Sequence, residues 1–416
     1  MSTADRPLRI GFLGSGFMAG FHLEALNAVR HCEVTAVHSP TPTHCRQFAE
    51  RATSAGLGSC RALPTAGDLI SSDEVDAVWV VGPNDTRLEH MRLVHQLVAS
   101  GEARLLGVAV EKPLGRNLAE AQAMFDLARD AGLNHGYLEN QVFAPAVRRG
   151  KEVLWDRAVP TAGRPYLVRA SEEHSGPHRS WFWQGPRQGG GVLLDMMCHS
   201  VEVARFLLTA PGSPRDSLDI RSATGTTSTL KWSRPEQAAL LRRSMGADVD
   251  YLRAPAEDVA HGTLELVDED GLPLRIETST SWAYVGPGLR IAIEVLGPEY
   301  SMSVDTLSTN LKVFLSRAVS AGGTSGHDLI EKQNAEQGNL PVLEDEAVTY
   351  GYVAEDRHMV ESFRSGARPE ETFADGVEVI EALMALYLSA ELERTVRPGE
   401  VDLTSYRPPV ARGGAG

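Results

Sequence analysis

The sequence predicts an α/β protein of two domains, and two patterns along the chain carry that prediction. Residues 8–140 alternate short apolar strands with helical segments, which is typical of a parallel sheet covered by helices. From about residue 165 the strands alternate apolar and polar residues across short turns, which indicates an open, mostly antiparallel sheet. We place an N-terminal Rossmann domain at 1–142, a C-terminal α/β domain at 143–405, and a disordered tail at 406–416.

Composition restricts the class of protein. The 416 residues, 42% of them hydrophobic and 23% charged, suffice for two cores. The net charge of -15 argues against a nucleic-acid partner. No apolar run approaches the roughly 20 residues that span a bilayer, and the N-terminus lacks the apolar core of a signal peptide. We therefore expect a cytoplasmic protein without a membrane partner, whose four cysteines stay reduced because none forms a CxxC pair.

A glycine turn follows the first strand. The apolar strand 8–14 runs into this turn, and a helix continues through residue 28. Strand, glycine turn and helix in this order predict a dinucleotide-binding site, because Gly14 permits the tight turn and Gly16 lets a pyrophosphate approach the backbone. The helix N-terminus adds free N–H groups and a positive dipole end. The expected cofactor contacts of this turn are Gly14, Gly16, Phe17 and Met18.

The second strand, 34–38, ends without the acidic residue that would hold the adenosine ribose of NAD. His38, Ser39 and Pro40 stand there instead, and Arg46, the nearest arginine, follows a turn or two later. Loss of the acid removes a repulsion against a 2′-phosphate, yet one distant arginine supports NADP only weakly. We expect NAD, with NADP as the alternative and Ser39 as a contact.

Later strands bring further residues to the same edge of the predicted sheet. The strand 75–82 ends in Pro83-Asn84, and the strand 105–110 ends in Glu111-Lys112-Pro113. Ligands bind at this edge of an open α/β sheet, and a lysine there can stabilise charge that develops on a substrate oxygen. The alternative is a surface lysine in a turn. The cofactor contacts expected from these strands and from the strand 134–140 are Pro83, Asn84, Glu111, Lys112 and Asn140.

Residues 188–206 run from three glycines into a helical pattern that aligns Asp195, His199 and Glu202 on one face. An imidazole titrates near neutral pH, and a carboxylate one turn away can support its protonated form. These properties suit a general base for an alcohol. The glycines would let another backbone or a substrate come close. A buried helix whose polar residues are merely satisfied is the alternative reading.

The segment 172–188 before this helix concentrates hydrogen-bond donors, cations and aromatic rings in an acidic protein. Indoles stack on sugar rings, and an arginine fork binds carboxylate, sulfonate or phosphate. The same side chains could instead cap a loop or fill a dimer interface. No metal site is expected, because Gly176-Pro177 keeps His174 and His178 off one helix face, where they could bind zinc with Cys198. The expected substrate contacts are Tyr137, His174, His178, Arg179, Trp181, Trp183 and Asp195.

Three further segments complete the chain. We predict surface insertions at 231–260, which is charged, and at 321–347, which is rich in glycine, asparagine and glutamate. A last amphipathic helix is expected at 376–393.

Six motifs occur in a fixed order along the chain. They are the glycine turn, Pro83-Asn84, Glu111-Lys112-Pro113, Asn140 with Phe143 and Pro145, the Gly-Gly-x-x-x-Asp-x-x-x-His segment, and a terminal helix behind Gly366-x-x-Pro369. In this order the chain resembles the Gfo/Idh/MocA family, the oxidoreductases similar to glucose-fructose oxidoreductase and inositol dehydrogenase, over nearly its whole length. The resemblance implies a Rossmann domain and a second α/β domain whose open sheet often mediates homodimers or homotetramers.

The resemblance also implies NAD(P)-dependent hydride transfer at a hydroxyl-bearing carbon. Lys112 would orient the reacting hydroxyl, Asp195 would hold the substrate, and His199 would take the hydroxyl proton. Three departures make any borrowed substrate name unsafe. Arg87 stands where the family often has a histidine, Met197 replaces a common glycine, and Val142 replaces an arginine.

We expect a dehydrogenase or reductase of a small-molecule carbohydrate, namely a sugar, a sugar acid or a cyclitol. The first alternative is a redox-neutral NAD-dependent glycosidase, which oxidises C3 transiently, eliminates the aglycone, adds water and returns the hydride. It needs a further acid/base pair, for which Tyr137, Glu139, Glu172 or Glu173 are available. An anionic sulfo- or carboxy-sugar glycoside would suit Arg179 and its aromatic neighbours. A non-catalytic dinucleotide-binding sensor is the third hypothesis, and the complete catalytic set counts against it.

Overall fold

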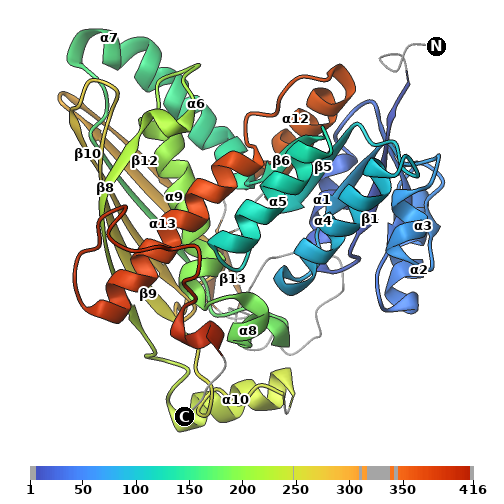
Figure 1. Cartoon of the computed structure of the whole chain (residues 1–416). Coiled ribbons are helices and arrows are strands. Elements are labelled where there is room, and N and C mark those ends of the chain that lie inside the picture. The colour runs from blue at the N-terminus through green and yellow to red at the C-terminus, as the bar shows by residue number, and fades with distance from the viewer. Residues whose placement is uncertain (1–5, 247, 309–311, 316–337, 342–344, 413–416) are drawn as a thin grey trace. The chain divides into compact units, whose positions relative to one another are not determined.

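A computed structural model describes residues 6–308 except 247, together with 312–315, 338–341 and 345–412. The chain divides into two compact units (Figure 1). The first unit comprises Met1–Pro145 and Ala347–Ile380, and the second comprises Ala146–Glu346 and Glu381–Gly416. Each unit is therefore built from two stretches that lie far apart in the sequence.

The first unit is built on a six-stranded parallel sheet with the order β3-β2-β1-β4-β5-β6. This order reverses direction between β1 and β4, as in a Rossmann domain, and the predicted N-terminal fold is confirmed. The strands are β1 Leu8–Leu13, β2 Cys32–His38, β3 Arg61–Ala62, β4 Ala77–Val80, β5 Gly107–Glu111 and β6 Asn134–Leu138. The helices between them are α1 Phe17–Leu26, α2 Pro42–Ser54, α3 Ala66–Ile70, α4 Asn84–Ala99 and α5 Leu118–Asp130.

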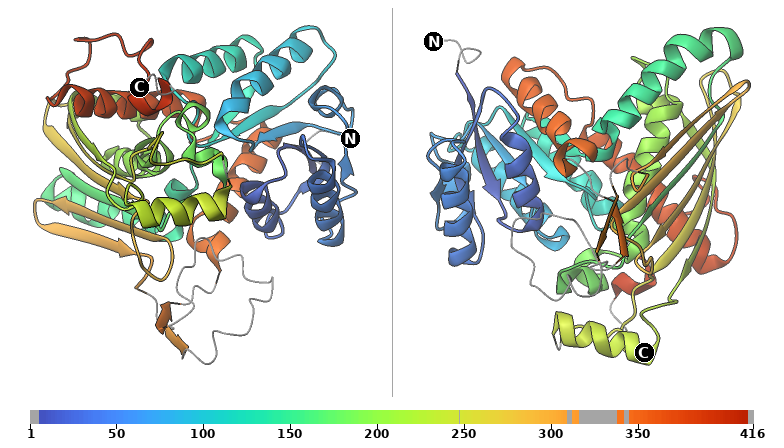
Figure 2. Two further views of the ribbon diagram at one scale, coloured as in Figure 1. Left: turned by 90° about the horizontal axis from the view of Figure 1, so that it is seen from below. Right: turned by 180° about the vertical axis from the view of Figure 1, so that it is seen from behind.

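Helix α12, Tyr352–Ser365, packs directly on this sheet although it follows it by more than 200 residues in the sequence. A Cβ atom at Gly107 would lie 2.5 Å from the ring of Phe363, and one at Gly136 would collide with Met359. The two glycines therefore make room for α12 over β5 and β6. Phe363 also contacts Trp79, with ring centroids 5.7 Å apart. Figure 2 shows α12 in orange beside the blue strands and helices of this unit.

The second unit is built on a six-stranded sheet with the order β12-β11-β7-β10-β9-β8. Strands β7 and β10 pair in parallel, and the other neighbours are antiparallel. The predicted open, mostly antiparallel sheet is confirmed. The strands are β7 Leu167–Glu173, β8 Asp219–Ser228, β9 Val259–Val267, β10 Pro273–Ser281, β11 Arg290–Gly297 and β12 Tyr300–Asp305, and a separate hairpin joins β13 Lys312–Leu315 to β14 Gly338–Pro341.

The helices after β6 are α6 Pro145–Val153, α7 Val159–Ala162, α8 Gly185–Gln188, α9 Val192–Leu208, α10 Pro235–Met245, α11 Glu346–Thr349 and α13 Phe373–Leu392. Helix α9 packs on the sheet of the second unit against β7 and β10 (Figure 1). The opposite face is polar and carries exposed cross-strand ion pairs, because alternate residues of a strand point to opposite faces. Arg169 lies 2.9 Å from Glu277 and 3.2 Å from Glu294 on this face.

The remaining segments differ in part from their predictions. The charged segment 231–260 contains α10 and also buries Tyr251 and Ala256. The tail predicted to be disordered is ordered through Arg412, which pairs with Glu391 at 2.8 Å because a charged partner lies within reach. Most of the insertion predicted at 321–347 lies outside the described residues. The last helix is confirmed as α13.

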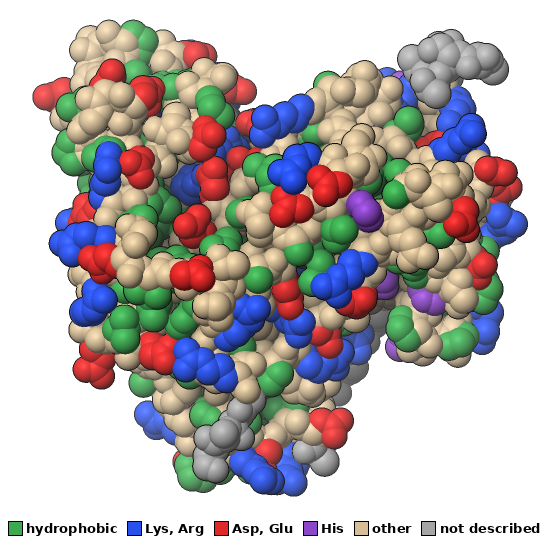
Figure 3. Space-filling view, viewed as in Figure 1, with side chains coloured by type: hydrophobic (Ala, Val, Ile, Leu, Met, Phe, Trp, Pro, Cys, Tyr) green, Lys and Arg blue, Asp and Glu red, His purple; other side chains and the backbone are tan. Residues whose placement is uncertain are grey.

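The surface and the helices add two general observations. Acidic and basic side chains are interspersed over the face drawn in Figure 3. None of the helices in the described part of the chain combines the length and apolarity that crossing a bilayer requires. All four cysteines are free thiols.

Candidate functional site

In the first unit, the ends of β1, β2 and β4 meet at the glycine turn. Gly14 has φ 122°, and a Cβ there would lie 3.0 Å from the backbone nitrogen of Gly82. The hydroxyls of Ser15 and Ser39 are 2.7 Å apart, which joins the turn to the end of β2. Because Pro83 and Asn84 follow Gly82 directly, the predicted contacts from three strands lie around this turn.

The start of α1 fits the pyrophosphate of a dinucleotide. A Cβ at Gly16 would meet no atom within 4 Å, so a ligand can approach the backbone there. The first turn of α1, which begins with Phe17 and Met18, contains no acidic residue that would compete for the free N–H groups. No ligand is drawn in this structure, and the role of these residues stays a prediction.

Arg87 on α4 fixes the turn that carries Lys112. Its Nε donates to the carbonyl of Gly82 at 3.0 Å, and its Nη1 donates to the carbonyls of Glu111 and Pro113 at 2.5 and 2.6 Å. The side chain is buried, so these hydrogen bonds are shielded from water. Sequence reasoning noted Arg87 only as a departure from the family pattern. Its position in the first turn of a helix after Pro-Asn was the available signal.

The carboxylate of Glu111 is directed into the interior. Its Oε1 lies 3.1 Å from Nε2 of the fully buried His22. Burial raises the pKa of Glu111, but the hydrogen bond and the charge of His22 outweigh burial and leave this pKa below its usual value. The Glu111 side chain is therefore occupied by His22, and the structure gives no support for it as a cofactor contact.

Two other predicted residues of the first unit are also buried. Asn140 donates from Nδ2 to the carbonyl of Tyr350 at 2.7 Å, which holds the chain at the end of β6. Tyr137 is fully buried, and its ring lies against Gly376 of α13. Its role as a substrate contact stays a prediction.

In the second unit, α9 begins on a buried pair formed by Glu257 and Tyr387, which are hydrogen-bonded to each other. The N–H of Gly191 donates to both side chains, at 2.9 and 3.0 Å. The N–H groups of Leu193 and Leu194 donate to Glu257 and Tyr387, each at 3.2 Å. These bonds satisfy donors that a helix N-terminus leaves free.

This pair explains the glycines before α9. A Cβ at Gly191 would lie 2.5 Å from Glu257 Oε2, and one at Gly190 would collide with the Tyr387 hydroxyl. We expected the glycines to admit a backbone or a substrate, and they admit two side chains instead. Burial raises the pKa of Glu257 above its usual range, and burial with the adjacent carboxylate raises that of Tyr387 well above its own.

The C-terminal end of α9 is held by three donors from the preceding helical segment. Lys151 donates to the carbonyl of Phe206 at 2.6 Å, Trp155 to that of Leu207 at 3.1 Å, and Arg164 to that of Leu208 at 3.1 Å. The last carbonyls of a helix lack partners within the helix, so these bonds fix its end.

Between its two ends, α9 carries the predicted catalytic residues on successive turns. Asp195 and His199 are each 3% exposed. Asp195 accepts a hydrogen bond from Trp282 Nε1 at 3.2 Å. Glu202 instead forms a buried ion triad with Arg205 at 2.5 Å and Arg215 at 2.6 Å, so it anchors the helix. Trp282 was not predicted, although a tryptophan that ends a strand pattern was visible in the sequence.

The segment predicted to bind substrate separates into buried and exposed parts. Trp183 is 2% exposed and packs against Trp282, Trp232 and Tyr251, with centroid distances of 5.0, 5.3 and 5.8 Å. His174 is fully buried, and its Nδ1 accepts the N–H of Gly176 at 2.9 Å.

These two side chains belong to the core because indole and imidazole rings fill it, so we no longer expect Trp183 to stack on a sugar. His178 and Arg179 are exposed, and Trp181 is half-buried and stacks on Phe182 at 3.8 Å.

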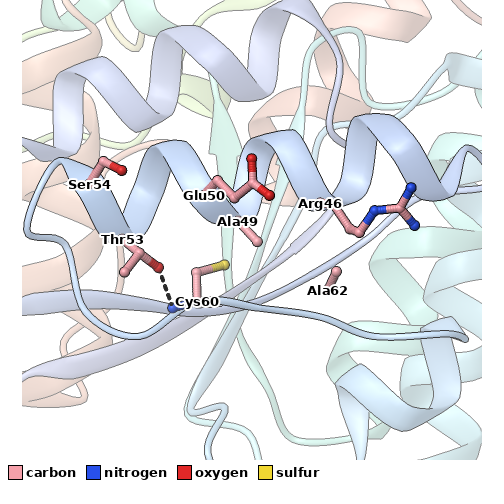
Figure 4. A pocket seen from close by; sticks show the side chains of 7 residues that line it. All are labelled: Arg46, Ala49, Glu50, Thr53, Ser54, Cys60 and Ala62. Carbon is pink, nitrogen blue, oxygen red and sulfur yellow. Dashed lines mark hydrogen bonds between the residues drawn. The ribbon is translucent and has the colours of Figure 1, made fainter.

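A separate hollow of about 350 Å³ lies between α2 and β3 (Figure 4). Figure 4 draws the sulfur of Cys60 between α2 and the strand, with Arg46 at one end. Burial raises the pKa of Cys60 to about 12. Its thiol therefore stays protonated and unreactive at neutral pH.

Comparison with known families follows this geometry closely. The model described as "Oxidoreductase family, NAD-binding Rossmann fold" matches residues 8–137, and the "GFO/IDH/MocA C-terminal domain" matches residues 160–302. The chain belongs to the Gfo/Idh/MocA family. This membership confirms the predicted family, the two-part α/β fold and the NAD-binding character of the Rossmann domain.

Curated relatives within the family are distant. The rhizopine catabolism protein MocA of Rhizobium meliloti is 30% identical over 48% of this chain and 56% of that protein. Myo-inositol 2-dehydrogenase of Thermotoga maritima is 27% identical over 48% and 55%. The chain thus spans about half the length of these two relatives. D-apiose dehydrogenase of Paraburkholderia graminis is 24% identical over 95% of this chain and 91% of that protein.

Solved structures of the family superpose over nearly the whole chain. The structure of GenD2 from gentamicin A biosynthesis in complex with NAD has a TM-score of 0.74 and 27% identity, and covers 94% of this chain and 96% of that one. A probable dehydrogenase of Thermotoga maritima has a TM-score of 0.69 at 21% identity, over 95% and 100% of the two chains. The second likeness concerns the fold alone.

Proposed function

We propose that the chain is an NAD-dependent oxidoreductase that transfers a hydride to or from a ring hydroxyl carbon of a sugar, a sugar acid or a cyclitol. The observation that carries the proposal is the pair Asp195 and His199 on successive turns of α9, in a family member that also has Lys112 at the end of β5. Relatives named myo-inositol 2-dehydrogenase and D-apiose dehydrogenase support the substrate class. NADP is the alternative cofactor, and the name of a D-xylose 1-dehydrogenase [NADP(+)] relative supports it.

The residues divide the work of the reaction. NAD, when bound, accepts the hydride from the carbon that bears the hydroxyl. Gly14, Gly16 and the first turn of α1 would hold its pyrophosphate. Lys112 would orient the hydroxyl and stabilise negative charge on its oxygen, and His199 would take the hydroxyl proton as general base. Asp195, held by Trp282, would accept a hydrogen bond from a substrate hydroxyl.

Replacing His199 with alanine tests this assignment. We expect kcat to fall by roughly 10²- to 10⁴-fold, because the hydroxyl proton loses its acceptor, while the Kd for NADH stays unchanged. Steady-state turnover and NADH fluorescence titration measure the two quantities. The control is His261→Ala, which removes an exposed imidazole from β9 of the same unit. Unchanged turnover of His199→Ala would exclude this residue as the base.

A redox-neutral glycosidase is the second candidate, and buried carboxylates support it. Glu139 and Glu172 are 0% and 4% exposed and could supply the further acid/base function. Glu173 is less suited because it pairs with Arg290 at 3.1 Å. Assays with free sugars and their aryl glycosides would follow NADH and aglycone together. Net NADH formation supports the dehydrogenase, and aglycone release with only catalytic NAD supports the glycosidase.

Arg179 tests whether the substrate is anionic. We predict that Arg179→Ala raises KM for a sugar acid about tenfold and raises KM for the matching neutral sugar much less, because an exposed guanidinium binds carboxylate by charge and paired hydrogen bonds. The matched control is Arg221→Ala, which removes an exposed arginine that is paired with Asp219 at 2.9 Å. Equal changes for both sugars would contradict an anionic substrate.

A further inference from the structure

A buried cluster of charged side chains surrounds His22 in the first unit. His22 on α1 and the neighbouring Glu355 and Asp356 on α12 are all 0% exposed. Nδ1 of His22 lies 3.0 Å from both carboxylate oxygens of Asp356, and Nε2 lies 3.1 Å from Glu111 Oε1. Trp79 Nε1 donates to Asp356 Oδ1 at 3.0 Å. Each nitrogen of the imidazole therefore faces a carboxylate.

Glu355 is the member of this cluster that hydrogen bonds leave unexplained. Within the described residues, neither of its buried carboxylate oxygens has a hydrogen-bond partner. One ligand atom from each of His22, Glu355 and Asp356 nevertheless lies within 4.8 Å of the others. A buried carboxyl group without partners costs roughly 1–3 kcal/mol or more. A bound proton alone does not remove that cost, because the acid would still lack an acceptor.

The balance of charge in the cluster favours a cation. Three carboxylates, from Glu111, Glu355 and Asp356, surround one imidazole in a region without solvent. Charges buried in this way require pairing or coordination. A divalent ion would neutralise two of the carboxylates and give both oxygens of Glu355 a partner.

We propose that His22, Glu355 and Asp356 form a buried site for one divalent transition-metal ion, Zn²⁺ or Mn²⁺. Metal–ligand bonds of about 2.1 Å at right angles place two ligand atoms about 3 Å apart, which matches the separation of His22 Nδ1 and the Asp356 oxygens. An imidazole with two carboxylates suits these ions better than Mg²⁺ or Ca²⁺, which take oxygen ligands.

The surrounding side chains support this arrangement. Glu111 accepts a hydrogen bond from Nε2–H of His22, which leaves the Nδ1 lone pair directed at the ion. Trp79 orients Asp356 in the same way. The site would join α1, α12 and the end of β5. It has no solvent exposure, so the ion stabilises the unit and takes no part in hydride transfer.

Metal content of the full chain tests the proposal. The protein is produced in media that contain Zn²⁺, Mn²⁺ or only Mg²⁺, passed through buffer with a chelator, and measured by elemental mass spectrometry. The buffer strips surface ions, whereas an enclosed ion stays in place. We expect about one Zn²⁺ or Mn²⁺ per chain and a Tm above that of the Mg²⁺ preparation.

Two variants locate the ion. Glu355→Gln keeps the shape of the side chain but removes its charge, and we expect less than about 0.1 ion per chain and a Tm that no longer depends on the medium. Asp76→Asn is the matched control. It removes another buried carboxylate of the first unit, one that is paired with Arg6 and Arg9, and should keep about one ion per chain.

Three outcomes would overturn the proposal. The first is wild-type protein with less than about 0.1 Zn²⁺ or Mn²⁺ per chain, and the second is Glu355→Gln with undiminished metal. If Glu355→Gln does not fold, Co²⁺-loaded wild-type protein decides the question. Cobalt bands without thiolate charge transfer support the site, whereas thiolate bands or no bands are the third contrary outcome. Metal content does not depend on turnover, so the proposed function can fail separately.

Discussion

At the scale of single residues, Arg87 and Trp282 each hold a predicted catalytic residue in place. Arg87 bonds the backbone on either side of Lys112, and Trp282 bonds the carboxylate of Asp195. Both are long side chains with fixed donors and almost no exposure, so they position a neighbour with little freedom of their own. A residue that holds a catalytic group carries no motif of its own, which is why the sequence did not predict these two roles.

His135 on β6 predicts how stability depends on pH. Burial, with the nearby charge of Arg368, lowers its pKa to about 4, and its Nδ1 accepts the N–H of Phe373 at 3.1 Å. The unfolded chain, with a pKa near ~6.5, binds more protons between pH 6.5 and 4, so the free energy of unfolding falls as pH drops through that window. We predict a loss of about 2–3 kcal/mol from this group.

Urea unfolding between pH 7 and pH 4 measures this dependence, and His135→Asn should flatten it by that amount. His261→Asn is the control, because an exposed imidazole contributes little to the slope. A His135→Asn variant with the slope of the wild-type protein would contradict the prediction.

At the scale of elements, α9 shows what sequence patterns reach and what they miss. The glycines, the helix and the alignment of Asp195 with His199 could all be predicted, because each depends on residues within one or two turns. The side chains at the start of α9 could not, since Glu257 and Tyr387 lie 66 and 196 residues away from Gly191. Burial also decided the fate of Trp183, which composition alone made a candidate for sugar binding.

Tyr387 predicts how much the start of α9 contributes to stability. Tyr387→Phe removes the hydroxyl that accepts from Gly191 and Leu194 and donates to Glu257, and it leaves three buried groups with fewer partners. We expect the free energy of unfolding to fall by about 2–3 kcal/mol, as measured with urea.

Tyr300→Phe is the control for this variant. Its hydroxyl bonds only the carbonyl of Gly163, at 2.9 Å in an exposed position, and its loss should cost less than about 1 kcal/mol. Equal losses for the two variants would show that the start of α9 does not depend on Tyr387.

At the scale of the whole molecule, both sheets could be predicted because strand periodicity and turn residues are local signals. The return of residues 347–380 to the first unit could not be predicted, since an amphipathic helix does not specify which sheet it covers. Gly107 and Gly136 are the trace of this packing in the sequence, yet a glycine in a strand has several explanations. Arg412 likewise orders a tail whose composition indicates disorder.

Separation of the two stretches of the first unit predicts the behaviour of a fragment. Residues 1–145 alone lack Met359, Val360 and Phe363, which belong to the core of this unit. We expect this fragment to unfold without cooperativity and to bind a hydrophobic dye, as thermal unfolding monitored by circular dichroism and dye fluorescence would show.

A second fragment, in which a flexible linker joins residues 1–145 to 347–380, provides the comparison. It contains the whole of the first unit and should unfold cooperatively. Cooperative unfolding of the shorter fragment at the same temperature would mean that α12 is dispensable for the fold.

The glycine-lined face beneath α12 also has a consequence for biosynthesis. A ribosome that adds roughly 5–20 residues per second needs about 10–40 s to move from the end of the first stretch to the beginning of α12. Throughout that interval the nascent dinucleotide-binding unit exists as an unfinished sheet, while the intervening polypeptide emerges. The earliest residues to leave the ribosome thus belong to a unit that cannot be completed until near the end of translation.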